Sequence, residues 1–281
     1  MSAAILDGKE LAKKLLAQIS AQVSSRSSTS KKLGLATVLV GDDAASKSYV
    51  AGKHRDCAEV GISSIKVELE KNASKSQLLD QISKLNSDTN CTGFLVQLPL
   101  PNSFAVTEIL AKISPEKDVD GLTPENLGLL ALGKPRVIPC TARAIQYLLQ
   151  HYRIDIAGRQ VLIIGRGMTV GRPLSILLSS KENNATVTLA HSASKDLPQL
   201  IAKNDVVITA VGKPNWLKSD WVKSDATVID VGITKLAEKL VGDCDEKVVQ
   251  KCKFYAPVPG GVGPLTRAML LQNLLDLAKA E

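Results

Sequence analysis

Short apolar runs alternate with longer amphipathic segments through the first half of the chain. The runs predict buried strands at residues 35–40, 65–69 and 93–98. The amphipathic segments predict helices at residues 4–23, 44–60, 75–85 and 104–113. Apolar residues at helical spacing indicate one buried helix face, whereas a short continuous apolar run indicates a buried strand. Their regular alternation is typical of an α/β domain built on a parallel sheet.

A turn-rich passage at residues 114–139 breaks this alternation. Its Asp, Gly and Pro clusters indicate turns, and we expect a domain boundary near residues 139–141. Beyond it, a helix is predicted at residues 142–151. Four further strands, expected to be parallel and buried on both faces, are predicted at residues 160–164, 186–190, 206–210 and 227–231. The polar stretch at residues 24–32 is predicted to be a loop.

A glycine loop follows the first strand of the second half. Gly165, Gly167 and Gly171 have the spacing G-x-G-x-x-x-G, one residue longer than the usual dinucleotide fingerprint. Because the strands predicted after it are of the expected type, the loop favours a dinucleotide-binding, Rossmann-like domain. A tight structural turn is the alternative.

The residues at the end of the next predicted strand indicate which dinucleotide the domain prefers. Sites that prefer NAD often carry Asp or Glu there, to bind the ribose hydroxyl. This chain has His191, Ser192 and Lys195 instead, and Arg166 in the glycine loop adds a fixed cation. These groups would accommodate a 2′-phosphate, so NADP is favoured. An ordinary solvated loop is the alternative for Ser192 and Lys195.

A second group of polar residues falls in the first half. Tyr49 and Lys53 are four residues apart on a predicted helix and therefore share a face. A buried lysine whose pKa is lowered can transfer protons near neutral pH. Gln97 ends the third predicted strand, and Asp120 lies in the following turn, where a carboxylate could accept paired N–H donors. The alternatives are an exposed lysine beside a packed tyrosine, a strand-end amide and a turn carboxylate.

The segment at residues 257–267 is rich in proline and glycine and precedes an apolar helical pattern at residues 268–280. Glycine permits a close backbone approach, while proline restricts φ. The segment could hold a flat or anionic ligand at a helix N-terminus. It could equally be a rigid connector with Pro264 at the first helical position.

Composition narrows the functional classes. The chain has 281 residues, a formal net charge of +7 and 3% aromatic residues. Its basic residues are dispersed and aromatic residues for base stacking are scarce, which favours small anionic ligands over nucleic acid. No apolar run approaches the ~20 residues that span a bilayer, and no signal-peptide pattern is present. Five scattered cysteines without a C-x-x-C pair favour a reducing cytoplasm over a disulfide framework or a metal site.

Several segments, in order, resemble the bifunctional methylenetetrahydrofolate dehydrogenase/methenyltetrahydrofolate cyclohydrolase family over nearly the full length. The segments that carry the resemblance are Leu6-Asp-Gly-Lys, Tyr49-x3-Lys53, Gly93-Phe-Leu-Val-Gln-Leu-Pro-Leu, Pro115-Glu-Lys-Asp-Val-Asp-Gly-Leu-Thr, Ile138-Pro-Cys-Thr, the Gly165 loop and Pro257-Val-Pro-Gly-Gly-Val-Gly-Pro-Leu-Thr. Gly167 and Thr169 depart from the Ser and Ile that many relatives carry.

The resemblance implies NADP-dependent oxidation of 5,10-methylenetetrahydrofolate and hydrolysis of the methenyl product to 10-formyltetrahydrofolate. It implies a folate-binding α/β domain at residues 1–139, an NADP domain at residues 140–266, and a helix at residues 267–281 that returns to the first domain. Folate would bind in the cleft between the domains, and the protein would be a cytoplasmic homodimer that supports purine biosynthesis.

The resemblance also implies residue roles. Tyr49 would stack on folate, Lys53 would catalyse the cyclohydrolase step, Gln97 would hold Lys53, and Asp120 would anchor the pterin. The loop residues expected beside the substrate are Pro259, Gly260 and Gly261. The residues expected at the cofactor are Gly165, Arg166, Gly167, Gly171, His191, Ser192 and Ile233.

Two rival functions stay open on the sequence. A monofunctional dehydrogenase would share the cofactor site, but Lys53 argues for the second activity. A non-catalytic NADP- or RNA-binding protein could use the basic surface, but the set of Tyr49, Lys53, Gln97 and Asp120 argues against it. Hydrolysis of supplied methenyltetrahydrofolate and salt-dependent RNA binding distinguish these rivals.

Overall fold

The computed structural model describes residues 2–26, 31–236 and 239–280. Of the loop predicted at residues 24–32, residues 27–30 lie outside the described residues. The chain divides into two compact units. The first, called here the six-stranded unit, comprises Met1–Ala12 and Thr141–Thr266, and the second, called the three-stranded unit, comprises Lys13–Cys140 and Arg267–Glu281.

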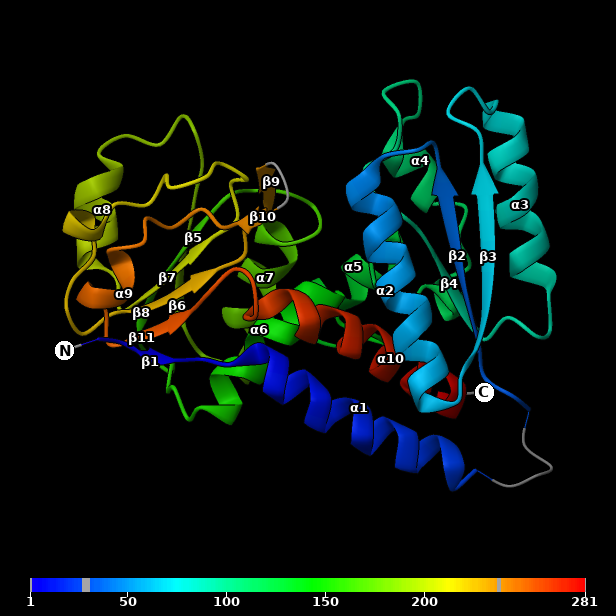
Figure 1. Cartoon of the computed structure of the whole chain (residues 1–281), viewed down its shortest axis with the longest axis horizontal. Coiled ribbons are helices and arrows are strands. Elements are labelled where there is room, and N and C mark those ends of the chain that lie inside the picture. The colour runs from blue at the N-terminus through cyan, green and yellow to red at the C-terminus, as the bar shows by residue number, and fades with distance from the viewer. Residues whose placement is uncertain (1, 27–30, 237–238, 281) are drawn as a thin grey trace. The chain divides into compact units, whose positions relative to one another are not determined.

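The three-stranded unit is built on a parallel sheet in the order β3-β2-β4 (Figure 1). Its strands are β2 (Gly34–Val40), β3 (Ser63–Leu69) and β4 (Gly93–Val96). The helical elements that lie wholly within it are α2 (Ala44–Val60), α3 (Lys75–Ser87), α4 (Val106–Leu110), the 3-10 turn η1 (Pro115–Lys117) and α5 (Pro124–Ala131). Every residue of β2 is buried, as its unbroken apolar run predicts.

Local signals set the helix ends in this unit. Asp43 caps α2 by accepting a hydrogen bond from the Ser46 N–H at 2.8 Å, and Gly61 ends the helix at φ 78°. Ser74 and Gln77 form a reciprocal capping box at the start of α3. The position of α2, which carries Tyr49 and Lys53, is thus fixed at both ends.

The six-stranded unit contains a fully parallel sheet in the order β1-β11-β8-β7-β5-β6. Its strands are β1 (Ala4–Ile5), β5 (Gln160–Ile164), β6 (Thr186–Ala190), β7 (Val206–Thr209), β8 (Thr227–Asp230) and β11 (Phe254–Ala256). Its helices are α6 (Cys140–His151, of which Cys140 belongs to the other unit), α7 (Gly171–Leu178), α8 (Leu197–Lys203), α9 (Val248–Lys251) and the 3-10 turn η2 (Ser219–Trp221). A small antiparallel hairpin consists of β9 (Thr234–Leu236) and β10 (Lys239–Val241).

The start of the chain differs from the sequence prediction. Residues 4–23 were expected to form one helix in the first domain, but β1 pairs with β11 at the sheet edge, and α1 (Gly8–Ser24) begins only after it. Asp7 explains the break, because its carboxylate caps the helix by accepting the Glu10 N–H at 2.9 Å. Residues up to Ala12 therefore belong with the six-stranded unit.

Two other elements also differ. The passage predicted as turns contains α5, which Thr123 caps by accepting the Asn126 N–H and which has Pro124 at its start. The final helix, α10 (Val262–Ala280), begins six residues before the predicted start at residue 268, so Pro264 lies inside its first turn. A proline is tolerated there because the first-turn N–H groups have no partner within the helix.

The C-terminal part of α10 packs in the three-stranded unit. A Cβ on Gly93 of β4 would overlap Val119 and lie 3.1 Å from Leu274 of α10, so glycine permits both close approaches. Asn273 is fully buried, and its Nδ2 donates to the carbonyl oxygens of Val119 at 2.8 Å and Ile138 at 2.9 Å. None of the helices in the described part of the chain combines the length and apolar character needed to cross a bilayer.

Asn273→Ala should lower the free energy of unfolding by roughly 2–3 kcal/mol, because two buried carbonyl oxygens lose a donor. The shift in the urea-unfolding midpoint measures this. Gln272→Ala, at the neighbouring half-buried position, is the control and should change stability by less than about 0.5 kcal/mol. Equal effects of the two variants would contradict the assigned role of Asn273.

Candidate functional site

Lys53 projects from α2 in the three-stranded unit and is 5% exposed. Its Nζ donates to Gln97 Oε1 at 3.0 Å, and the Gln97 Nε2 donates to the Leu98 carbonyl oxygen at 2.7 Å. The Nζ also lies 5.3 Å from the centre of the Tyr49 ring. The structure therefore brings Tyr49, Lys53 and Gln97 together, as their positions one helical turn apart and at a strand end predict.

Burial lowers the pKa of Lys53 because a charged ammonium is poorly solvated there. The negative charge of Asp120 opposes this lowering, and the positive charge of Arg267 adds to it. A lysine with a lowered pKa has a larger fraction of neutral amine, which can accept a proton.

The two carboxylates of the Asp118–Asp120 turn have different surroundings. Asp118 is buried and accepts hydrogen bonds from the Gly121 and Thr123 N–H groups and from Asn126 Nδ2. These hydrogen bonds hold the turn together, so Asp118 is a structural turn carboxylate. Asp120 is half-buried and acts electrostatically on Lys53.

Two buried cysteines, Cys57 and Cys140, also lie near this amine. Burial raises the pKa of the Cys57 thiol to about 12, so it stays protonated at neutral pH. Cys140 Sγ donates to the Val119 carbonyl oxygen at 3.3 Å and accepts from Asn273 Nδ2 at 3.4 Å.

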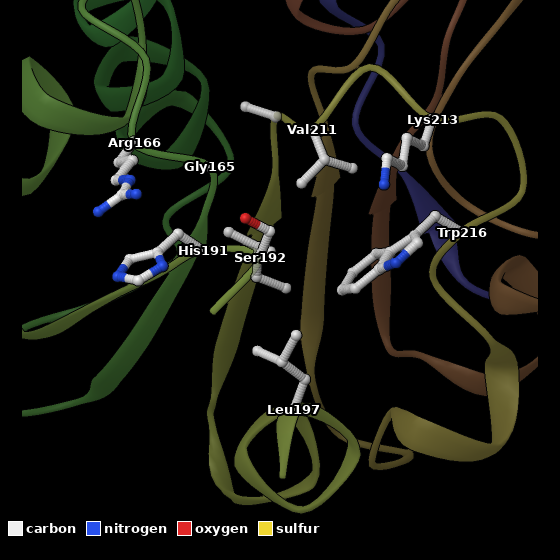
Figure 2. Close-up of a pocket in the computed structure, with 10 residues that line it drawn as sticks. Gly165, Arg166, His191, Ser192, Leu197, Val211, Lys213 and Trp216 are labelled. Carbon is white, nitrogen blue, oxygen red and sulfur yellow. The ribbon is translucent and has the colours of Figure 1, made fainter. Parts of the chain in front are cut away.

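A separate cavity of about 390 Å³ lies in the six-stranded unit (Figure 2). Arg166 and His191 lie on one side, and Lys213 and Trp216 lie on the opposite side. Ser192 also lines the cavity, together with Gly165 from the glycine loop. The cationic and hydroxyl groups fit an anionic phosphate, and the tryptophan offers an apolar surface to a ring.

The three loop glycines do not serve one purpose. Gly165 has φ 118°, and a Cβ there would overlap the Ala210 carbonyl oxygen. A Cβ on Gly171 would overlap the Gly165 carbonyl oxygen, so the two glycines are needed for the turn from β5 into α7. Gly167 is exposed and has open space around it. The tight turn and the ligand cavity therefore coexist.

Comparison with known proteins identifies the family on both units. Residues 6–120 match the tetrahydrofolate dehydrogenase/cyclohydrolase catalytic domain, and residues 139–281 match the NAD(P)-binding domain of the same family. The chain belongs to this family.

Solved structures agree with this membership. The chain is similar to the bifunctional dehydrogenase/cyclohydrolase of Campylobacter jejuni, with 41% identity, TM-score 0.94, and 99% of each chain covered. It is 36% identical to the Trypanosoma brucei enzyme solved with NADP and an inhibitor, with TM-score 0.95 and coverage of 100% of this chain and 98% of that one. It is 33% identical to the bifunctional enzyme of Thermoplasma acidophilum, with TM-score 0.90 and coverage of 99% and 98%.

The chain therefore carries both the catalytic and the NAD(P)-binding domain of a tetrahydrofolate dehydrogenase/cyclohydrolase. The predicted two-domain α/β fold, with a parallel-sheet nucleotide domain, is confirmed.

Ile233 lies just after β8 and is 47% exposed, outside the residues that line the cavity. In the proline–glycine loop, Gly260 has φ 103° and open space, whereas a Cβ on Gly261 would lie 2.5 Å from the Pro257 carbonyl oxygen. The Gly261 N–H also donates to that oxygen at 2.8 Å. Glycine at position 261 is therefore required by the loop itself. Pro259, with a cis peptide bond before it, is exposed.

Sequence reasoning missed two buried carboxylates beside the nucleotide cavity. Asp243 accepts the N–H groups of Val211, Gly212 and Lys213 at 2.7, 3.3 and 2.8 Å. Val211 and Lys213 line the cavity, so Asp243 fixes one of its walls. Asp230 in turn accepts the Asp243 N–H at 2.9 Å. The signals were an aspartate at the end of an apolar strand, Asp230, and the aspartate after Gly242, and both are weak without the fold.

Two glycines make room for the buried carboxylates of Asp243 and Asp230. A Cβ on Gly232 would overlap the Asp243 carboxylate, and a Cβ on Gly242 would overlap the Asp230 carboxylate. Burial raises the pKa of Asp230, and its accepted backbone hydrogen bonds oppose that rise. Both carboxylates are almost fully buried from solvent, and both accept hydrogen bonds from backbone N–H groups. These hydrogen bonds stabilise the wall of the cavity.

Asp243→Asn should weaken NADP binding by about 10-fold, because an amide nitrogen would face N–H donors and the Val211–Lys213 wall would shift. Fluorescence titration with NADPH measures this. Hydrolysis of supplied methenyltetrahydrofolate should be retained, because Lys53 lies in the other unit. Asp245→Asn is the control, because among the described residues the Asp245 carboxylate accepts one backbone N–H group, that of Lys247. An unchanged affinity for NADPH in Asp243→Asn would contradict this role.

Proposed function

We propose that Lys53 is the proton-transfer residue of the cyclohydrolase reaction and that Gln97 positions its amine. The observation that supports this is a buried lysine amine bonded to a strand-end amide oxygen, 3.0 Å away. A neutral amine next to the cationic methenyl substrate avoids the repulsion that an ammonium would suffer.

The proposed reaction has two steps, and the Lys53 amine takes part in the second. In the first reaction the methylene carbon of 5,10-methylenetetrahydrofolate loses a hydride, and NADP supplies the acceptor for that hydride. Water then adds to the resulting methenyl carbon while the Lys53 amine takes a proton from the water. One carbon–nitrogen bond of the ring opens, the departing nitrogen is protonated, and 10-formyltetrahydrofolate forms with a net release of one proton.

The other residues have supporting roles in this proposal. Tyr49 lies beside the Lys53 amine and presents a ring face on which a pterin could stack. Asp120, half-buried near that amine, would accept N–H groups from the aminopyrimidine ring. Pro259, Gly260 and Gly261 would line the substrate, and Gly260 supplies the loop with backbone geometry that other residues rarely adopt.

Lys53→Met should reduce methenyltetrahydrofolate hydrolysis by at least about 100-fold, because the proton acceptor is removed. Absorbance loss of supplied methenyltetrahydrofolate measures this, and Lys47→Met, an exposed lysine on the same helix, is the control. Wild-type hydrolysis by the Lys53 variant would contradict the proposal and would favour a monofunctional dehydrogenase.

The same variant also has a pH-dependent effect on stability. Since the folded-state pKa of Lys53 is lowered, the folded protein binds this proton less tightly than the unfolded chain. Burial therefore costs stability most below the folded pKa, and the cost disappears as pH rises to the unfolded value. The stability gained by Lys53→Met should accordingly decrease as pH rises toward about 10; a pH-independent difference in urea midpoints would contradict the lowered pKa.

NADP preference is proposed to come from the cavity groups that accept a 2′-phosphate. Arg166 and Ser192 are exposed at the cavity, with His191 beside them and Lys213 opposite. Gly165, Gly167 and Gly171 would let the backbone approach the pyrophosphate, and Ile233 would contact the cofactor from the strand end.

Arg166→Ala should raise the KM for NADP by about 10-fold and leave the KM for NAD within about 2-fold, because only NADP has the 2′-phosphate. Initial dehydrogenase rates with each coenzyme measure this. Arg172→Ala, on the exposed part of α7 and outside the cavity, is the control. Equal increases in both KM values would contradict the phosphate role.

A homodimer, a cytoplasmic location and a supply of formyl groups for purine biosynthesis complete the proposal. Ile5, Leu236 and Leu240 are each nearly half exposed and line a cavity of about 550 Å³ next to the β9–β10 hairpin. A second copy that covers this apolar face would account for it. Sedimentation velocity tests the dimer, cell fractionation tests the location, and a purine requirement after gene loss tests the supply.

A further inference from the structure

Arg267 makes an ion pair that none of the assigned roles requires. It lies in the three-stranded part of α10, and its Nε donates to Asp56 Oδ2 on α2 at 2.7 Å. A second contact joins Arg267 Nη2 to Asp56 Oδ1 at 3.5 Å. The side chain of Asp56 is 9% exposed and that of Arg267 is 27% exposed. An ion pair with this degree of burial is sensitive to the loss of either partner.

The ion pair joins α10 to the part of α2 that carries the Lys53 amine. Asp56 follows Lys53 by three residues, so the two side chains are helical neighbours. Gly52 precedes Lys53, and a Cβ there would lie 3.2 Å from both the Cδ and Nε of Arg267. Glycine costs helix stability at an interior position. Its presence at position 52 leaves room for the guanidinium to lie across the turn that contains Lys53.

We propose that the Arg267–Asp56 pair is a positioning pair for Lys53, which holds its turn of α2 in place and sets the balance of charge around its amine. The inference rests on the proposed catalytic role of Lys53. In this proposal Arg267 and Asp56 do not touch the substrate, and both act on the reaction through Lys53.

The charges around Lys53 make the proposal testable. Asp120 faces it from the turn before α5, Arg267 from α10, and the buried thiols of Cys57 and Cys140 lie nearby. The charged or titratable residues that directly follow it on α2 are His54, Arg55 and Asp56. Arg267 contributes to the lowered pKa of Lys53, after burial and against the opposing charge of Asp120.

The two partners should therefore have opposite effects on the amine. Arg267→Gln removes a positive charge and leaves the Asp56 carboxylate unpaired, and both changes favour the ammonium form of Lys53. Asp56→Asn removes a negative charge and leaves the guanidinium, which favours the neutral amine. A pair that merely held two helices together would lower stability in both variants without shifting the titration of Lys53 in opposite directions.

The experiment measures the rate of methenyltetrahydrofolate hydrolysis against pH for the full chain, with the rate of Lys53→Met subtracted as background. Arg267→Gln should move the pH midpoint of activity upward by about one unit, and Asp56→Asn should move it downward by a similar amount. Arg267→Lys keeps the charge and should leave the midpoint within about 0.3 units while lowering the rate, because the fork geometry is lost. Arg55→Gln, which removes an exposed positive charge from α2, is the matched control and should leave both quantities unchanged.

The outcomes separate the inference from the function on which it rests. Midpoints that shift in the same direction, or that do not shift, in folded Arg267→Gln and Asp56→Asn proteins would overturn the positioning pair. Wild-type hydrolysis by Lys53→Met would instead overturn the role of Lys53 itself. If Arg267→Gln does not fold, the double variant Arg267→Gln/Asp56→Asn removes both charges, so the two opposite shifts offset and its midpoint should lie within about one unit of the wild-type midpoint; a larger shift would contradict the proposal.

Discussion

The burial of one lysine amine is the constraint around which the three-stranded unit is organised. An ammonium that is 5% exposed is costly unless its charge is balanced or its proton is lost. Lys53 meets this constraint with an amide acceptor from Gln97, a tyrosine ring beside it, and charges of both signs from Asp120 and Arg267. The caps at both ends of α2 and the packing of α10 keep these groups in place. A site that needs a neutral amine thus depends on helix ends and a returning helix as much as on the amine itself.

In each unit a buried carboxylate holds a backbone segment in place, which is a different role from that of Lys53. Asp118 organises the turn before α5, and Asp243 organises the loop that lines the nucleotide cavity. Each accepts several backbone N–H groups, an arrangement that satisfies a buried charge without a cation. The neighbouring Asp120 is half-buried and is left to act on Lys53. Two acidic residues two positions apart in sequence therefore differ in function because only one of them holds the backbone.

Much of the fold could be predicted from apolar periodicity, because buried parallel strands such as β2 and β5 are continuous apolar runs. The two-residue β1 could not, because its apolar residues also fit the helix that follows, and only pairing with distant β11 decides between them. Lys53, Gln97 and the glycine loop could be found because helical spacing and strand ends carry local signals. Arg267, Asp56 and Asp243 could not, because their partners are distant along the chain: 211 residues separate the ion pair.

The titration of Lys53 in the folded protein tests the central claim most directly. Lysine labelled with 13C at the ε carbon reports its protonation by NMR, and Lys53→Met assigns the resonance. The account predicts a midpoint clearly below the unperturbed value of about 10.4. A Lys53 resonance that titrates at or above that value would contradict it.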